Sequence, residues 1–296
     1  HWAFPAIQPL PVSGTLVEMT SCSNVFGTHR VGAVSYLNTL PLIDGLEQTE
    51  NVEVVLGVPS RLAAGLETGE TDVALCPVID CQRSTTELEL VPVGLIGSHG
   101  HTHTVVLFSQ RPFEEIDAIS CDVDSHTSHV LLKVIMKLTY GRTPQLEPFD
   151  TTGDADRPAA VMLIGDKVVS RVPSRETHPY RLDLGEAWLA LTGRPFVFGA
   201  WFCRRDRDGA DRRRIQNLAV LLDHRRRANR GRIDSIVATH AAAHGWAVED
   251  ARRYLCETLQ FDPTPERLDG MHHFFDLAAK VGAIDAVRPL AIASMT

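Results

Sequence analysis

The sequence has no long apolar run, no excess of positive charge and no paired cysteines. No stretch approaches the roughly 20 apolar residues of a membrane-spanning helix. The formal net charge of −8 over 296 residues argues against general binding to nucleic acid or to an anionic membrane. The six cysteines include no CxxC pair and no zinc-like spacing, and most lie in apolar runs. This usage predicts a reduced, cytoplasmic protein in which cysteine serves as a small core residue.

The first 29 residues contain no lysine or arginine and only a short apolar patch. A secretory signal needs a basic start followed by an apolar stretch of about 7–15 residues. We therefore expect an N-terminal extension over residues 1–29 in place of a signal peptide. The ordered part of the chain is expected to begin near Arg30.

One segment departs from the acidic balance of the chain. Residues 204–232 hold eleven arginines against four aspartates, a local net charge of +7. The apolar residues of this segment keep helical spacing, from Ile215 through Leu218 to Leu222. We interpret the arginines as the solvated face of an amphipathic helix, with nucleic-acid binding as the alternative.

The first predicted strand ends at a polar side chain. Residues 30–42 read RVGAVSYLNTLPL and begin with a strand-like run up to Tyr36. Asn38 follows, and Pro41 prevents the strand from continuing. In open α/β sheets ligands bind beyond the carboxyl ends of strands, where an amide can both donate and accept hydrogen bonds. Asn38 is therefore a candidate ligand-binding residue, with a helix cap as the alternative.

Strands and helices alternate along the first part of the chain. Predicted strands at 52–57 and 71–77 flank a helix that starts at Pro59, which favours a parallel, doubly wound sheet. A second α/β set begins at Ala118, and from Ala210 onward the pattern is essentially all helical.

The order of these units predicts two lobes. If the chain passes from one lobe to the other at the strands 104–109 and 196–203, the middle unit is an insertion. The C-terminal helices then belong to the first lobe. The first lobe would then comprise residues 30–106 and 196–296, and the second residues 107–195.

Two further segments place polar side chains where a strand ends or a helix begins. The helix predicted over Ser125–Tyr140 starts with the polar turn Ser125-His126-Thr127-Ser128. Hydroxyls beside the unpaired N–H groups of a helix start suit a carboxylate or phosphate, with a simple cap as the alternative. Asp166 closes the strand VMLIGD, where it could accept a hydrogen bond from a substrate hydroxyl, act as an acid, or cap the next turn.

Histidines raise the question of a metal site. The loop Ser98-His99-Gly100-His101-Thr102-His103 alternates them, and His240 and His244 lie one helical turn apart. No carboxylate or cysteine stands at ligand spacing nearby, and HAAAH lacks the glutamate of a metalloprotease helix. We expect no metal, and interpret the loop as a polar cleft segment whose Ser98 and Thr104 hydroxyls hold a substrate. Motifs for phosphoryl transfer, nicotinamide binding and serine-triad chemistry are also missing.

Several segments are informative in combination. They follow one another over about residues 30–285, and read VGAVSYLNTLPL, PSRLAAGLETGETDVALCPVID, TVVLFSQRPFEEI, DSHTSHVLLKV, VMLIGDKVV, DLGEAWLALTGRPFVFGAWFCR and, more loosely, YLCETLQFD and GMHHFFDLAAKVGAI. In this order they resemble the chorismate dehydratase family of the futalosine route to menaquinone.

The resemblance implies an α/β fold with two lobes, like type II periplasmic binding proteins, and a helical C-terminal segment. It implies a cytoplasmic lyase without a cofactor that converts the dianion chorismate to 3-[(1-carboxyvinyl)oxy]benzoate and water. The substrate's own enolpyruvyl carboxylate would take the C3 proton. No nucleic-acid or membrane partner is implied, and a homodimer is left open. The resemblance assigns catalytic roles to Asn38 and Thr104 and substrate binding to Ser98, Ser125, Thr127, Ser128 and, as our own hypothesis, Asp166 at the 4-hydroxyl.

The chain departs from the family pattern at the histidine loop. It reads SHGHTHTV where relatives usually carry something like SDGPVxSV, so His99 replaces Asp, while Thr104 replaces Ser and keeps the hydroxyl. Two alternatives follow from the same fold. One is a solute-binding protein that binds a small anion without turnover. The other is the dihydroxynaphthoate synthase of the same pathway, whose usual SPCPNDTF-like opening is absent here.

Overall fold

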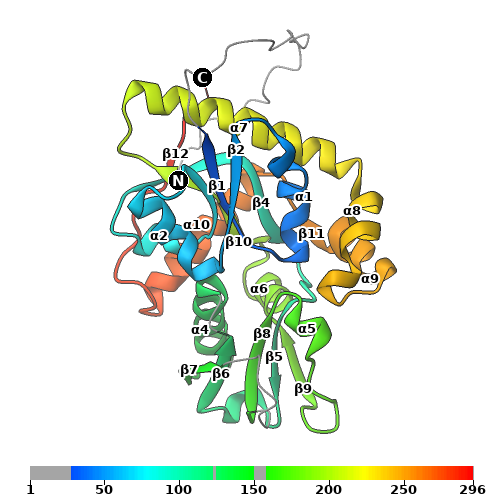
Figure 1. The fold of residues 1–296 in the computed structure, drawn as a ribbon. Helices are drawn as coiled ribbons and strands as arrows, with labels where there is room; N and C mark the ends of the chain where they lie inside the picture. Colours follow the sequence, from blue (N-terminus) through cyan, green and yellow to red (C-terminus); the bar gives the residue numbers. More distant parts are fainter. Residues whose placement is uncertain (1–27, 123–124, 150–157, 296) are drawn as a thin grey trace.

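The structure, a computed structural model, describes residues 28–122, 125–149 and 158–295. These residues form two β-sheets, one above the other in Figure 1, with helices packed against both. We call the upper sheet with its helices the first lobe, and the lower sheet with its helices the second lobe. Almost all of the N-terminal extension predicted over residues 1–29 lies outside the described residues.

The first lobe is built on a mixed sheet with the strand order β11-β4-β10-β3-β1-β2, and β12 also pairs with β4. Its strands are β1 (His29–Ala33), β2 (Val52–Leu56), β3 (Val73–Pro77), β4 (Leu88–Ser98), β10 (Phe196–Arg204), β11 (Leu259–Gln260) and β12 (Ala291–Ile292). β1 runs parallel to both β2 and β3, as predicted. β10 runs antiparallel to β3 and β4, so the sheet as a whole is mixed and the predicted parallel arrangement holds for β1, β2 and β3. The chain returns from the second lobe at the start of β10. β10 therefore begins at the edge of the sheet where β3 and β4 end.

The second lobe is built on a sheet with the strand order β7-β6-β8-β5-β9. Its strands are β5 (Val105–Ser109), β6 (Ala118–Asp122), β7 (Gln145–Phe149), β8 (Ala160–Ile164) and β9 (Tyr180–Asp183). β5 lies wholly in this sheet and β10 wholly in the other, so neither strand crosses between the lobes. The chain instead passes between the sheets in the segments 99–104 and 193–195.

Helices cover both sheets (Figure 1). In the first lobe they are α1 (Leu40–Ile43), α2 (Pro59–Thr68), α3 (Asp80–Arg83), α7 (Gly209–Arg230), α8 (Ile233–His240), α9 (Val248–Arg253) and α10 (Pro265–Lys280). In the second lobe they are α4 (His126–Tyr140), α5 (Lys167–Ser170) and α6 (Leu184–Thr192). Short helical turns lie at η1 (Leu37–Thr39), η2 (Leu46–Gln48), η3 (Phe113–Glu115), η4 (Ala242–His244) and η5 (Tyr254–Thr258).

Two helices illustrate how sequence patterns produced these elements. α4 begins after Ser125, whose side chain caps it, and ends at Gly141, which adopts a left-handed φ of 66°. α7 buries Ile215, Leu218 and Leu222 on one side. This burial confirms that the arginine-rich segment is an amphipathic helix.

The C-terminal segment is less regular than its sequence pattern predicts. The helical pattern predicted from Ala210 onward is interrupted after α9, which ends at Arg253 and continues as a π-helical turn, η5. Residues 259 and 260 then form β11, which pairs antiparallel with the end of β4 at Ser98 and Gly97. The expectation of an all-helical tail is therefore wrong at this point, because pairing with a strand far away in sequence overrides the local helical pattern.

Candidate active site

A cavity lies between the two lobes. In the first lobe its wall includes the segment just beyond β1, the last residues of β3 and residues near the start of β10, as expected for a ligand site at strand ends. It is lined by Val34, Tyr36, Asn38, Pro59, Leu75, Cys76, Pro77, Ile96, Thr102, Thr104, Val105, Ser125, Ser128, Ile164, Gly165, Phe198, Gly199, Tyr254 and Leu259.

Four of the residues singled out from the sequence line this one cavity: Asn38 and Thr104, and Ser125 and Ser128. Asn38 belongs to η1 in the first lobe, whereas the serines belong to the start of α4 in the second lobe. The amide oxygen of Asn38 is buried and has no hydrogen-bond partner among the described residues. A buried polar atom of this kind is costly unless a ligand or water satisfies it.

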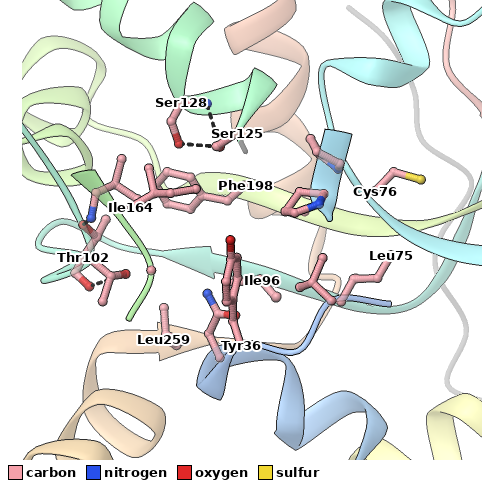
Figure 2. A pocket seen from close by; sticks show the side chains of 18 of the residues that line it. Tyr36, Leu75, Cys76, Ile96, Thr102, Ser125, Ser128, Ile164, Phe198 and Leu259 are labelled. Carbon is pink, nitrogen blue, oxygen red and sulfur yellow. Dashed lines mark hydrogen bonds between the residues drawn. The ribbon is translucent and has the colours of Figure 1, made fainter. Parts of the chain in front are cut away.

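The start of α4 serves both as a cap and as a cavity wall (Figure 2). The Ser125 Oγ accepts a hydrogen bond from the Ser128 N–H at 3.3 Å. The same hydroxyl donates to the Ser128 Oγ at 2.8 Å. The sequence left two interpretations of this turn open, a helix cap and a ligand contact. They are compatible, because Ser125 caps α4 and also lines the cavity.

Two other predicted site residues do not line the cavity. Ser98 is fully buried, and its hydroxyl donates to the carbonyl oxygen of Gly100 at 3.1 Å. Thr127 is also fully buried, and its Oγ1 accepts from the Ile79 N–H at 3.3 Å. Because Ile79 precedes α3 in the first lobe, Thr127 ties the start of α4 to the opposite lobe.

Asp166 likewise lies outside the lining and joins the lobes. It follows β8 and accepts hydrogen bonds from the Leu37 N–H at 3.3 Å and the Trp246 indole N–H at 2.8 Å. The His244 Nδ1 lies 2.8 Å from the same carboxylate. Asp166 makes no side-chain cap to α5. Its partner Leu37 immediately precedes Asn38, so this contact fixes the backbone beside a cavity residue.

Sequence reasoning missed three polar residues of the cavity: Tyr36, Thr102 and Tyr254. In Figure 2, Tyr36 rises from the first lobe into the cavity, and Thr102 lies at one side of it. The sequence pattern predicts that the first strand continues to Tyr36, but β1 ends at Ala33. Tyr254 belongs to the YLCETLQFD segment, and its place was hidden because that segment was expected to be an ordinary helix.

The histidine loop is organised by Asp183, a buried residue that caps α6. Its carboxylate accepts from the Thr102 and His103 N–H groups at 2.9 Å each, and the His101 Nδ1 lies 2.9 Å away. Gly185 allows this close packing, because a Cβ there would lie 2.4 Å from the Gly100 carbonyl oxygen. Within the described residues, no group of three histidine, cysteine, aspartate or glutamate side chains is arranged to hold a metal.

The described cavity lining contains no charged side chain and offers neutral donors. Burial raises the pKa of the Tyr254 phenol, although hydrogen bonds from Thr104 and Asn38 act in the opposite direction. Burial also raises the pKa of the Cys76 thiol well above its usual value, with a further contribution from Asp80. Both groups therefore stay protonated at neutral pH. Hydroxyls, an amide and the start of α4 remain as the polar groups that can meet a ligand.

The two lobes and the cavity between them define a protein with the periplasmic-binding-protein fold. The Candida albicans CA3427 gene product, described as having the generic periplasmic binding protein fold, matches with a TM-score of 0.64 at 12% identity over 89% of this chain and 92% of that chain. The alkanesulfonate-binding protein SsuA from Xanthomonas axonopodis pv. citri, bound to MOPS, matches with a TM-score of 0.58 at 15% identity, covering 90% and 96% of the two chains. Protein AF1704 from Archaeoglobus fulgidus matches with a TM-score of 0.59 at 14% identity, covering 86% and 98%.

A family model described as menaquinone biosynthesis matches residues 29–280. The chain therefore belongs to this menaquinone-biosynthesis family, and the family resemblance stated from the sequence motifs is confirmed. Among the described residues, none of the helices combines the length and the apolar character needed to span a bilayer.

Proposed function

We propose that this chain is a hydro-lyase that converts chorismate to 3-[(1-carboxyvinyl)oxy]benzoate and water. Membership in the menaquinone-biosynthesis family supports this reaction. The observation that carries the proposal is that Asn38 and the Ser125–Ser128 turn, which come from different lobes, line the same cavity. A ligand between them would meet an amide on one side and a helix start with hydroxyls on the other.

The chemistry needs few reactive side chains. Chorismate loses a proton from C3, which is acidified by conjugation to the C1 carboxylate, and hydroxide from C4. The electron pair of the C3–H bond completes the aromatic ring as the C4–O bond breaks. Because aromatisation drives the reaction, the protein must mainly hold the dianion in the reactive shape and exclude water.

The described cavity lining supports a base supplied by the substrate. Its hydroxyls, amide and thiol are neutral at physiological pH, so none of them readily accepts a proton from carbon. The enolpyruvyl group of the substrate is attached at C3 itself, so its carboxylate is a base close to the C3 proton. Ser125 and Ser128, with the start of α4, would bind a substrate carboxylate, while Asn38 and Thr104 orient the ring.

The remaining predicted site residues receive supporting roles in this proposal. Thr127 and Asp166 connect the lobes on either side of the cavity, through Ile79 and through Leu37. Ser98 shapes the histidine loop through its bond to Gly100. We propose that these three hold the lining in place, and that contact with the 4-oxygen falls to residues of the lining. The buried thiols of Cys76, Cys81, Cys121 and Cys203 support a cytoplasmic setting.

A solute-binding protein is the second candidate, because the fold is shared with the alkanesulfonate-binding protein SsuA. Such a protein would bind a small anion in the same cavity without changing it. The two candidates differ in one measurable respect, which is whether the chorismate diene is consumed.

The test is to incubate the purified protein with chorismate, without added metal or nucleotide, and follow the loss of diene absorbance and the release of product. We expect turnover by the wild type, and a loss of about 10²-fold or more in Asn38→Ala and Ser125→Ala, since each removes a positioned polar contact. Asn217→Ala and Ser235→Ala, at exposed helix positions, serve as matched controls with unchanged rates. Unchanged chorismate with folded wild-type protein refutes the dehydratase, and ligand binding without turnover would then favour the solute-binding protein.

A further inference from the structure

Tyr254 brings a buried phenol to the cavity from the start of η5. Its side chain is only 2% exposed, and its Oη lies 2.7 Å from the Thr104 Oγ1. Asn38 lines the same cavity, and its side chain lies close enough to this phenol to lower the pKa of Tyr254. Two hydroxyls and an amide therefore converge at one point of the wall, and two of the three already have roles in the proposed dehydration.

The ring of Tyr254 is held rigidly. Trp246 stacks on it with ring centroids 4.7 Å apart and planes inclined by 12°. The indole N–H of Trp246 donates to Asp166 in the second lobe at 2.8 Å, so the stack is fixed by a contact between the lobes. The phenol also begins a π-helical turn, a local irregularity that occurs often at functional sites.

The state of the phenol suits a proton donor. Burial keeps Tyr254 neutral, because it raises the pKa of the phenol more than the bonds to Thr104 and Asn38 lower it. A departing hydroxide is strongly basic, since water has a pKa of about 15.7. A neutral phenol in contact with the leaving oxygen is therefore able to supply its proton.

We propose that Tyr254 is a catalytic residue that holds the 4-oxygen of chorismate and protonates it as the C4–O bond breaks. This inference rests on the proposed dehydration and names the acid that the reaction requires. The electron pair of the C4–O bond leaves with the oxygen, which takes the proton from the Tyr254 Oη and departs as water. The tyrosinate regains a proton from the enolpyruvyl carboxylic acid formed at the first step, relayed by the Thr104 hydroxyl. The sum is the loss of one water, with Tyr254 again neutral.

Tyr254→Phe isolates the hydroxyl, because phenylalanine preserves the ring that stacks on Trp246. We expect kcat for chorismate to fall by about 10²-fold or more, the usual contribution of a general acid. The KM should change by less than about threefold, since the carboxylate contacts at α4 are untouched. Tyr180→Phe, on an exposed strand of the second lobe, is the matched control and should keep the wild-type rate.

A chorismate analogue with chloride in place of the 4-hydroxyl separates catalysis from structure, because chloride leaves without a proton. We expect the wild type and Tyr254→Phe to convert this analogue at rates within about threefold of each other. That result would also show that the variant is folded. An equal loss on both substrates, or no loss on chorismate, overturns the role of Tyr254 and leaves the dehydratase standing. If the wild type does not convert chorismate, the proposed function fails, and the role of Tyr254 fails with it.

Discussion

Asp183 is a single buried carboxylate on which the histidine loop and the start of α6 both depend. It is 6% exposed and accepts from the backbone N–H groups of Thr102 and His103 as well as from Gly185 at 3.0 Å. Because Thr102 lines the cavity, the Asp183 carboxylate helps to fix the position of a residue in the ligand site. An acceptor with two oxygens is needed here, because the donors approach both of them.

Asp183→Asn is therefore expected to destabilise the fold. The amide nitrogen would face N–H donors, and each buried donor left without an acceptor costs about 1–3 kcal/mol. We expect the free energy of unfolding, measured by urea titration, to fall by at least about 2 kcal/mol. Asp208→Asn is the matched control, because Asp208 also caps a helix but is exposed and should show a much smaller change. Equal midpoints for Asp183→Asn and the wild type would contradict this account.

The sequence identified site residues where local chemistry was sufficient. Asn38 and Ser125 were found because a polar residue at a strand end or helix start has few uses besides capping and ligand binding. The place of Asp166 at a strand end predicts a substrate contact, and nothing local reveals that its partners in the fold are Trp246 and His244, about 80 positions away. Tyr254 was missed for the same reason, since its neighbour Thr104 is 150 positions distant in the chain.

At the scale of elements, α3 and α4 meet across the lobes beside the cavity. The His126 Nδ1 in the first turn of α4 lies 2.8 Å from the Asp80 Oδ1 in α3. The hydrogen bond to Asp80 raises the pKa of His126, although burial acts in the opposite direction. The pair therefore joins the turn that carries Ser125 to the first lobe by a contact that depends on protonation.

This pair predicts a pH dependence of stability. The folded pKa of His126 lies above its usual value of 6.5, so its contribution to stability is fully present below that value. The contribution is lost as the pH rises through the folded pKa. The difference in Tm between the wild type and His126→Gln should thus be larger at about pH 6 than at about pH 8.5. His224→Gln, at an exposed position of α7, is the control. A difference that stays constant over this range would show that the pair does not titrate as described.

Elements with their own periodicity were predictable, whereas those defined by distant partners were not. α4 and α7 were found nearly to their ends because an apolar stripe at helical spacing is a local signal. The local pattern predicts a helix at the two residues of β11, because they become a strand only by pairing with β4 at Ser98 and Gly97. The sequence also does not predict the direction of β10, because no local feature of a strand shows whether it will pair parallel or antiparallel with its neighbours.

At the scale of the whole molecule, one hydrophobic cluster extends through both lobes, while two others each belong to a single lobe. α10 packs against both β10 of the first lobe and α4 of the second. One buried cluster contains Leu95, Phe196 and Phe274 from the first lobe together with Leu107, Leu131 and Met162 from the second. An apolar contact of this kind limits independent movement of the lobes. It also explains how Asn38 and Ser125 can face one cavity at a fixed separation.

This shared cluster predicts that the protein unfolds as a single unit. Leu131 is fully buried in α4, and Leu131→Ala should lower the free energy of unfolding by about 2–5 kcal/mol. Because the cluster continues into the first lobe, differential scanning calorimetry should show one transition in both proteins, shifted as a whole in the variant. Val220→Ala, at a half-exposed position on α7, should leave the transition nearly unchanged. If Leu131→Ala instead splits the transition, so that the first lobe melts at its original temperature, the lobes are independent. The fixed separation of Asn38 and Ser125 would then require a ligand to establish it.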